Sequence, residues 1–216
     1  MRRRVLIAAL LLALTLVGAA LARDPRAEQV RLKPADVALA NRIALKTADL
    51  GAGWSKQAIP AGEDSGMKCP EVDPDFSKFT ITGKARSAFV EQTTTQVLSS
   101  IEVYESRSDA VGDFRLGAKP QLAKCLRREI ERELSRTGLP MRVASARVVP
   151  APRVGENRIA FRVVAKIETP AARASIYADV IAFQRGRSIA VLSFTAPFKP
   201  YAQEAKVAVA VASRMR

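Results

Sequence analysis

The sequence lacks histidine altogether and is poor in aromatic residues. None of its 216 residues is histidine, and aromatic residues make up 6% of the chain. Because imidazole is the commonest general base and a common metal ligand, its absence excludes histidine-dependent catalytic triads and histidine-based metal sites. No motif that reads or stacks nucleic-acid bases occurs either. We therefore expect a non-catalytic protein with no cofactor, no metal and no nucleic-acid partner.

Long apolar runs are also missing, except at the N-terminus. Three arginines at positions 2–4 precede an apolar segment over 5–22 that ends in Ala20-Leu21-Ala22. This order predicts a secretory signal peptide over 1–22, cleaved after Ala22. At 18 residues the run lies between a signal core and a membrane span, so an uncleaved N-terminal anchor is the alternative. Either way the rest of the chain is expected to be secreted or held in the extracytoplasmic envelope, with the membrane reached only through this segment.

Acidic residues are in the minority. The chain has 35 Lys and Arg against 21 Asp and Glu, which gives a net charge of +14. Removing residues 1–22, which carry three arginines and no acid, leaves +11. A basic exported protein is attracted to anionic surroundings. The composition therefore predicts an anionic envelope component or a small ligand as the partner.

Cysteine occurs only twice. Cys69 and Cys125 lie 56 residues apart. In an exported chain an even number of cysteines predicts a disulfide, here one that joins a loop rich in Gly, Pro and Asp to a helix. A redox or nucleophilic role has little support because there is no CxxC motif. Two free thiols are the remaining alternative.

Hydrophobic periodicity predicts one α+β domain over 34–216, preceded by a flexible lead over 23–33. Segments with a helical period lie at 34–50, 109–117, 121–136 and 201–215, and the second of these helices has Ser108 as its cap. Segments with period two or with strand composition lie at 54–59, 79–91, 96–105, 142–149, 158–168, 173–184 and 188–195. Because strands follow strands through short joints, we expect a mostly antiparallel sheet of about six to seven strands with helices packed on it.

Several short motifs are similar to those of a known group of exported domains. They are Ala48-Asp49-Leu50-Gly51-Ala52-Gly53-Trp54, Cys69, Cys125-Leu126, Tyr177-x-Asp179 and Arg185-Gly186-Arg187. In these the chain resembles the extracellular sensor-like domain of PknH-type kinases and related envelope lipoproteins of actinobacteria. The resemblance implies a ligand-binding or sensor-like module of the cell envelope rather than an enzyme. The chain departs from that group in having one cysteine pair, no kinase domain and no cysteine for lipid attachment.

The candidate site lies on the polar faces of the strands. If the helices cover the apolar face, the opposite face presents cations, acids and two tyrosines, which suit an anionic or sugar-like ligand. The residues predicted to bind are Arg86, Tyr104, Arg158, Arg162, Lys166, Tyr177 and Asp179. An ordinary solvated sheet face explains the same pattern.

Two other functions remain open. A carboxylate-based hydrolase of envelope polymers would use Glu102 and Asp179, provided that their strands are neighbours and the carboxyl groups lie about 5 to 9 Å apart. A basic structural protein that adheres to the envelope is the other alternative.

Overall fold

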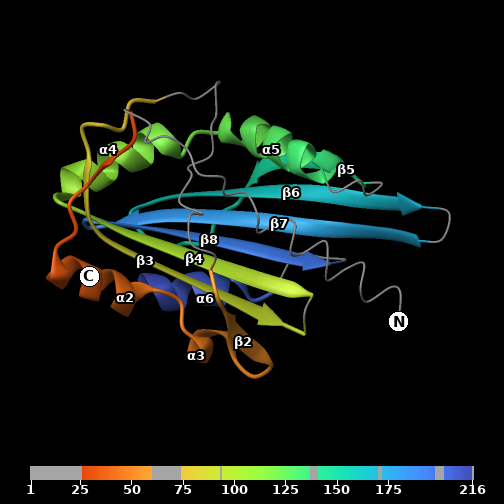
Figure 1. Ribbon diagram of the computed structural model, residues 1–216, viewed down its shortest axis with the longest axis horizontal. Helices are drawn as coiled ribbons and strands as arrows, with labels where there is room; N and C mark the ends of the chain where they lie inside the picture. The colour runs from red at the N-terminus through yellow and green to blue at the C-terminus, as the bar shows by residue number, and fades with distance from the viewer. Residues whose placement is uncertain are drawn as a thin grey trace.

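The sheet is the centre of the molecule. The computed structural model describes residues 26–59, 74–92, 94–136, 141–169, 172–197 and 202–215. Its strands follow the order β1-β3-β4-β8-β7-β6-β5, with β2 also paired to β3 (Figure 1). Their bounds are β1 Gln29–Val30, β2 Trp54–Gln57, β3 Thr80–Glu91, β4 Thr95–Tyr104, β5 Met141–Val149, β6 Asn157–Thr169, β7 Ala172–Arg185 and β8 Ser188–Pro197. The α+β class and the mostly antiparallel pairing are confirmed, but the sheet has eight strands rather than six or seven.

The additional strand, β1, comes from the segment that was predicted to be a flexible lead. β1 pairs in parallel with β3. The backbone N–H groups of Gln29, Arg31 and Lys33 donate to carbonyl groups of residues 79, 81 and 82 at 2.8–2.9 Å. Polar composition suggested a flexible segment, but backbone hydrogen bonds at a sheet edge do not depend on apolar side chains.

The helices differ from the prediction in two places. Their bounds are α2 Pro34–Ile43, α3 Thr47–Leu50, α4 Arg107–Gly117, α5 Leu122–Arg136 and α6 Glu204–Ala212. The single helix predicted over 34–50 is split because Ala44 has an extended ψ of 148°. The cap of α4 is Ser106 rather than Ser108, and the Ser106 hydroxyl accepts a hydrogen bond from the Asp109 N–H at 3.0 Å.

Helices cover both faces of the sheet, and the prediction that they lie on one face is wrong. α2, α3 and α6 pack on one face, called here the α2/α6 face, and α4 and α5 pack on the other, the α4/α5 face (Figure 1). β4 turns Val97 and Ile101 to the α2/α6 face, whereas β6 turns Phe161 and Val163 away from that face. The apolar side of the sheet therefore changes from one face to the other across the strands.

One row of paired residues shows this change. Val97 of β4 pairs with Phe194 of β8, Phe194 with Asp179 of β7, and Asp179 with Arg162 of β6. Paired residues on neighbouring strands lie on the same face. The row on the α2/α6 face is therefore apolar in the middle of the sheet and charged at β7 and β6.

Both layers contribute to stability, which two matched substitutions can test. Phe161 and Phe194 are each 1% exposed and lie on opposite faces. Phe161→Ala and Phe194→Ala are each expected to lower the free energy of unfolding by about 3 kcal/mol, because each leaves a cavity in a packed layer. Urea denaturation followed by circular dichroism measures both. A loss below about 1 kcal/mol for either variant would show that its face is not buried.

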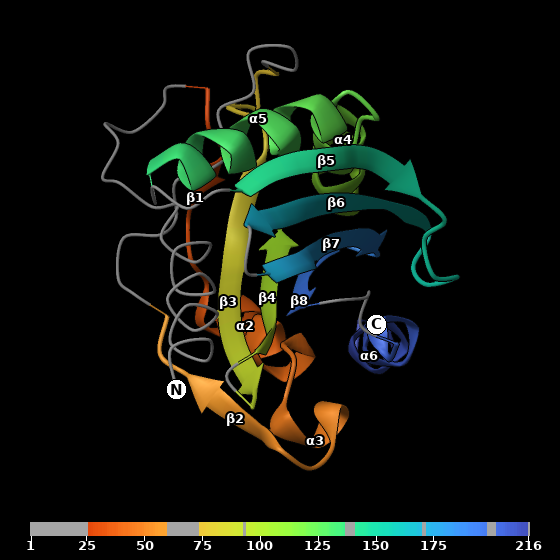
Figure 2. The ribbon, with the colours of Figure 1, turned by 90° about the vertical axis from the view of Figure 1, so that its right-hand side faces the viewer.

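The sheet twists strongly along its width. In the turned view, β3 and β4 run across the direction of β5 and β6 (Figure 2). This agrees with the fixed hand of strand twist accumulating over many strands. α2 packs on β3 and β4 and α6 packs on β8, and the twist turns the β5–β6 end of the same face away from α2. Side chains at that end, such as Lys166 and Tyr177, are half-buried.

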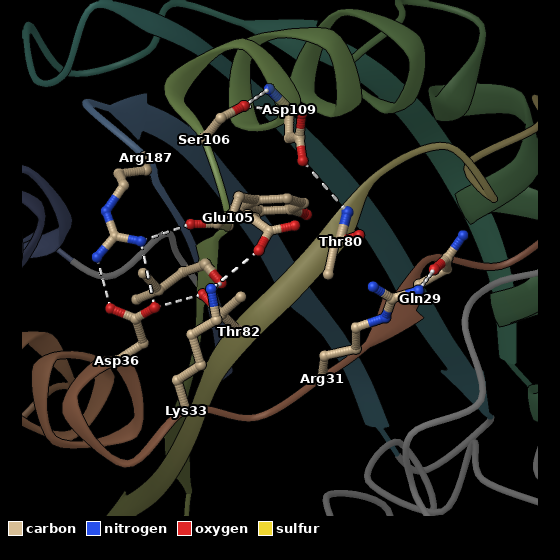
Figure 3. A network of polar contacts seen from close by, with 12 residues as sticks. Gln29, Arg31, Lys33, Asp36, Thr80, Thr82, Glu105, Ser106, Asp109 and Arg187 are labelled. Carbon is tan, nitrogen blue, oxygen red and sulfur yellow. Dashed lines mark hydrogen bonds and ion pairs between the residues drawn. The ribbon is translucent and has the colours of Figure 1, made fainter.

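A buried carboxylate joins α2 to the sheet. Asp36, near the start of α2, accepts a hydrogen bond from Thr82 Oγ1 at 2.6 Å and is paired with the Arg187 guanidinium (Figure 3). Arg187 also donates its Nη1 to the Tyr104 carbonyl oxygen at 2.8 Å. The Arg187 guanidinium holds the pKa of Asp36 below its usual value. The contact therefore ties α2, β3 and the β7–β8 hairpin together.

Two predictions involve residues outside the described ranges. The predicted signal segment and Cys69 are among these residues, while Cys125 is completely buried in α5. Cleavage and the disulfide therefore stay predictions. Within the described ranges, no helix is long and apolar enough to cross a membrane.

Candidate functional site

Five of the seven predicted site residues share one face of the sheet. Arg158, Arg162 and Lys166 alternate along β6, and Tyr177 and Asp179 lie on the same face of β7. β5 adds Arg147, which pairs with Arg162. We call this group the basic sheet face: Arg147, Arg158, Arg162, Lys166, Tyr177 and Asp179. It lies on the α2/α6 face, at the β5–β7 end.

Arg147 was not among the site residues predicted from the sequence. The period of β5 is interrupted, because the register with β6 shifts between Val143 and Ser145. A bulge moves every later side chain to the opposite face, so alternation alone does not place Arg147. Arg147 could be assigned to this face only from the pairing with β6.

A bidentate ion pair forms the floor of the basic sheet face. Arg162 Nε and Nη2 donate to Asp179 Oδ1 and Oδ2 at 2.7 and 2.8 Å. The Asp179 side chain is 3% exposed and that of Arg162 is 25% exposed. The hydrogen bonds with Asp179 raise the pKa of Arg162, with smaller contributions from Glu204 and Tyr177. Paired donation from a planar guanidinium fixes its orientation, so Arg162 is held against the sheet and its Nη1 has no partner within the described ranges.

The other cations of the basic sheet face have no counter-charge within the described ranges. Arg147 is exposed and lies directly opposite Arg162, whose charge is balanced by Asp179. Arg147, Lys166 and Tyr177 form no side-chain hydrogen bond or ion pair with any described residue. An anion placed here would gain several donors and would supply Arg147 and Lys166 with a counter-charge.

The cations of β6 are evenly spaced along the strand. Arg158, Arg162 and Lys166 are four residues apart. At about 3.3 Å per residue, neighbouring charges lie roughly 13 Å apart. Arg162 is neutralised by Asp179, but Arg147 of β5 lies opposite it. Arg158, Arg147 and Lys166 therefore present three uncompensated positive charges along the strand direction, with Tyr177 on β7 beside them.

Two predicted site residues lie elsewhere. Arg86 pairs with Ser100 on the α4/α5 face, and Tyr104 is fully buried on that face. The Tyr104 hydroxyl donates to Glu102 Oε2 at 3.0 Å. The prediction assumed that all polar strand faces lie on one side of the sheet. Because the apolar side changes from one face to the other across the strands, Arg86 and Tyr104 do not share a face with the other predicted site residues.

The carboxylate pair required by the alternative hydrolase function is also not formed. β8 lies between β4 and β7, so the strands of Glu102 and Asp179 are not neighbours. Glu102 faces α4 and α5, whereas Asp179 lies on the α2/α6 face. Asp179 is moreover fully engaged by Arg162. No group of three or more acidic or cysteine side chains in the described part of the chain is arranged to hold a metal ion.

Comparison with known proteins adds little. No protein-family model matches the sequence, and no curated protein matches it. Among solved structures, the chain is similar to an uncharacterised protein of Mycobacterium smegmatis, the Rv0999 ortholog, with 11% identity and a TM-score of 0.36. That match covers 83% of this chain and 95% of the other. The sequence identity and the TM-score are both too low for any property of that protein to be carried over to this chain. The similarity to PknH-type sensor domains stays a resemblance.

Proposed function

We propose that this chain is an exported, non-catalytic binding module that holds an extended polyanion of the cell envelope on the basic sheet face. The observation that carries the proposal is a set of cations without counter-charges at the β5–β7 end of the sheet: the exposed Arg147 and Arg158 and the half-buried Lys166. Nη1 of the paired Arg162 is a further donor beside them. The net charge of +14 would favour encounter with such a ligand.

The spacing of the charges favours a polymer over a small anion. A single phosphate or carboxylate reaches only neighbouring donors, here Arg147 and Arg162. Charges roughly 13 Å apart along β6 are used together only by a chain that carries repeated anionic groups. Tyr177 offers a ring and a hydroxyl beside this line, which suits contact with a polyol or sugar backbone.

Two alternatives differ in what they predict. A structural protein that adheres through charge alone would bind any surface of sufficient negative charge, without saturation at one site. A small-ligand sensor would bind a monomeric anion as tightly as a polymer. The proposed module requires saturable binding of the polymer and much weaker binding of its repeating unit.

The proposal is tested by titrating the protein with poly(glycerol phosphate), with glycerol phosphate as the repeating unit. Arg147→Gln and Lys166→Gln each remove one charge without breaking any contact among described residues. Each variant is expected to lose about 5- to 10-fold in affinity, which corresponds to roughly 1 kcal/mol per charged contact. Isothermal titration calorimetry measures the affinity at a fixed ionic strength.

Lys124→Gln is the matched control, because it removes an equal charge from α5, which packs on the opposite face of the sheet. The proposal requires the control to bind like the unaltered protein. Equal losses in all three variants would show that net charge alone attracts the polymer. Equal affinity for the polymer and for glycerol phosphate would overturn the extended site.

A further inference from the structure

The outer edge of β5 presents backbone groups without partners. β5 is the last strand in the sheet order, and no described strand lies beyond it (Figure 2). Between Val143 and Val149, the chain forms no hydrogen bond with any described residue outside the ladder with β6. An edge strand with unpaired N–H and C=O groups is a template for a further strand. The end of β5 is therefore able to accept one.

The pairing of neighbouring strands shows which residues of β5 turn these groups outward. The β7–β8 hairpin has a two-residue loop between Arg185 and Ser188, which makes these two residues a hydrogen-bonded pair. Because bonded and non-bonded pairs alternate, odd-numbered residues of β7 bond to β8 and even-numbered residues bond to β6. By the same alternation, even-numbered residues of β6 bond to β5, where they meet Arg147. The backbone groups of its neighbours Ala146 and Val148 therefore face away from the sheet.

The end of β5 is accessible and positively charged. Arg147 is exposed, and Val148 is 43% exposed and belongs to none of the packed clusters of described residues. α5 packs on the earlier part of the strand, in the cluster that contains Met141, Val143 and Ala146. β5 has two arginines and no acidic residue. Its open edge is therefore basic throughout.

The two faces of β5 differ at this end. Arg147 lies on the basic sheet face, whereas Val148 pairs with Phe161 and lies on the α4/α5 face. An added strand continues this arrangement, because directly opposite residues of paired strands lie on the same face. Acidic side chains at every second position would lie beside Arg147, and apolar side chains between them would lie beside Val148.

A second copy of this chain does not suit the edge. Arg142 and Arg147 pair with Lys166 and Arg162 of β6, so both lie on one face of the sheet. Antiparallel pairing of two β5 strands would bring the arginines of both copies together on that face, and like charges across a strand pair destabilise it. An acidic strand supplies the opposite charge in the same place.

We propose that the outer edge of β5 binds an extended acidic segment of a partner protein as a ninth, antiparallel strand. The backbone of Ala146 and Val148 exchanges hydrogen bonds with the apolar residues of that segment, and an acidic residue pairs with Arg147. Antiparallel addition is the more stable arrangement per residue. The site uses the backbone edge of the sheet and is separate from the proposed polymer site, although Arg147 contributes to both.

Fluorescence anisotropy with a labelled peptide of four Glu-Val repeats tests the added strand. In the proposed register the valine N–H groups of this probe donate to β5, whereas its glutamate N–H groups point away. Methylation of the valine nitrogens is expected to weaken binding about tenfold or more, because several hydrogen bonds are lost. Methylation of the glutamate nitrogens is the matched control and should leave binding unchanged. Equal binding of the two methylated peptides would overturn the proposal.

Val148→Pro tests the same contact from the side of the protein. Proline has no N–H group, and at this position it removes an outward donor rather than a bond to β6. The variant is expected to bind the probe about fivefold more weakly or worse. Val148→Ala keeps the N–H group and should bind like the unaltered protein. Circular dichroism checks the fold of both variants, and the methylated peptides carry the test should Val148→Pro fail to fold.

The same variants separate this site from the polymer site. Val148→Pro keeps every charge of the basic sheet face, so it should bind poly(glycerol phosphate) like the unaltered protein, whereas Arg147→Gln should weaken both ligands. The added strand is overturned, whether or not the polymer binds, by absence of saturable binding of the probe or by unchanged binding in a folded Val148→Pro variant. Equal binding of a peptide of four Lys-Val repeats would overturn the acidic character of the partner.

Discussion

Gly83→Ala is expected to destabilise the domain by more than about 3 kcal/mol, or to prevent its folding. Gly83 lies in β3 directly under the first turn of α2. A Cβ atom there would overlap the Asp36 carbonyl group and lie 2.9 Å from the Val37 nitrogen. These are backbone atoms that no rotamer change can move, so the cost should exceed the usual range for overpacking. Relief requires α2 to lift from the sheet, which would also break the Asp36–Arg187 pair.

Gly117→Ala is the matched control for Gly83→Ala. Comparing the two variants by thermal and urea unfolding separates the clash with α2 from a general effect of replacing glycine. A Cβ at Gly117 would make ordinary contacts of 3.7 and 3.8 Å with the Phe76 ring. Because alanine favours the helix, Gly117→Ala should leave stability unchanged or raise it slightly. A Gly83→Ala variant as stable as the unaltered protein would contradict the close approach of α2 to β3.

Removing the predicted disulfide has the second large expected effect. A bridge between Cys69 and Cys125 would close a loop of 56 residues. The chain-entropy account gives about 4 kcal/mol for such a loop, so reduction or Cys125→Ser should lower the free energy of unfolding by about that amount. Cys125 is completely buried and its sulfur accepts a hydrogen bond from Arg128. The serine variant therefore also changes the local packing, and its loss of stability sets an upper bound for the bridge.

The bridge itself is checked by mass spectrometry of the unfolded protein. Treatment with an alkylating reagent, without prior reduction, should modify neither cysteine. Modification of both would show that the thiols are free and would remove the predicted stabilisation. Reduction of the unaltered protein, compared with the Cys125→Ser variant, separates loss of the bridge from the packing change.

The regular elements were predictable because their apolar periods are strong. β3, β4 and β6 alternate cleanly, and α5 carries a continuous apolar stripe, so their type and approximate bounds follow from local sequence. β1 was not predictable, because it has only two residues and no apolar period. It is held at the edge of the sheet by backbone hydrogen bonds to β3, which leave no pattern in the side chains. The break at Ala44 was equally hidden, since alanine has no preference that would mark the end of a helix.

The candidate site was only partly predictable for a different reason. Alternation places Arg158, Arg162 and Lys166 on one face of β6 from sequence alone, and this is confirmed. Alternation within one strand does not show whether this face of β6 is the face that carries Arg86 and Tyr104 on the distant strands β3 and β4. The relation between the two faces depends on the register of β8, which pairs with both β4 and β7.

Mapping of the bound polymer by NMR tests the central claim most directly. Titration of isotope-labelled protein with poly(glycerol phosphate) is expected to shift the signals of Arg147, Arg162, Lys166 and Tyr177 in a saturable manner. Signals of Lys84, Glu102 and Asp113 on the opposite face should stay unchanged. Shifts scattered over all exposed lysines and arginines, or confined to the α4/α5 face, would contradict a polyanion site on the basic sheet face.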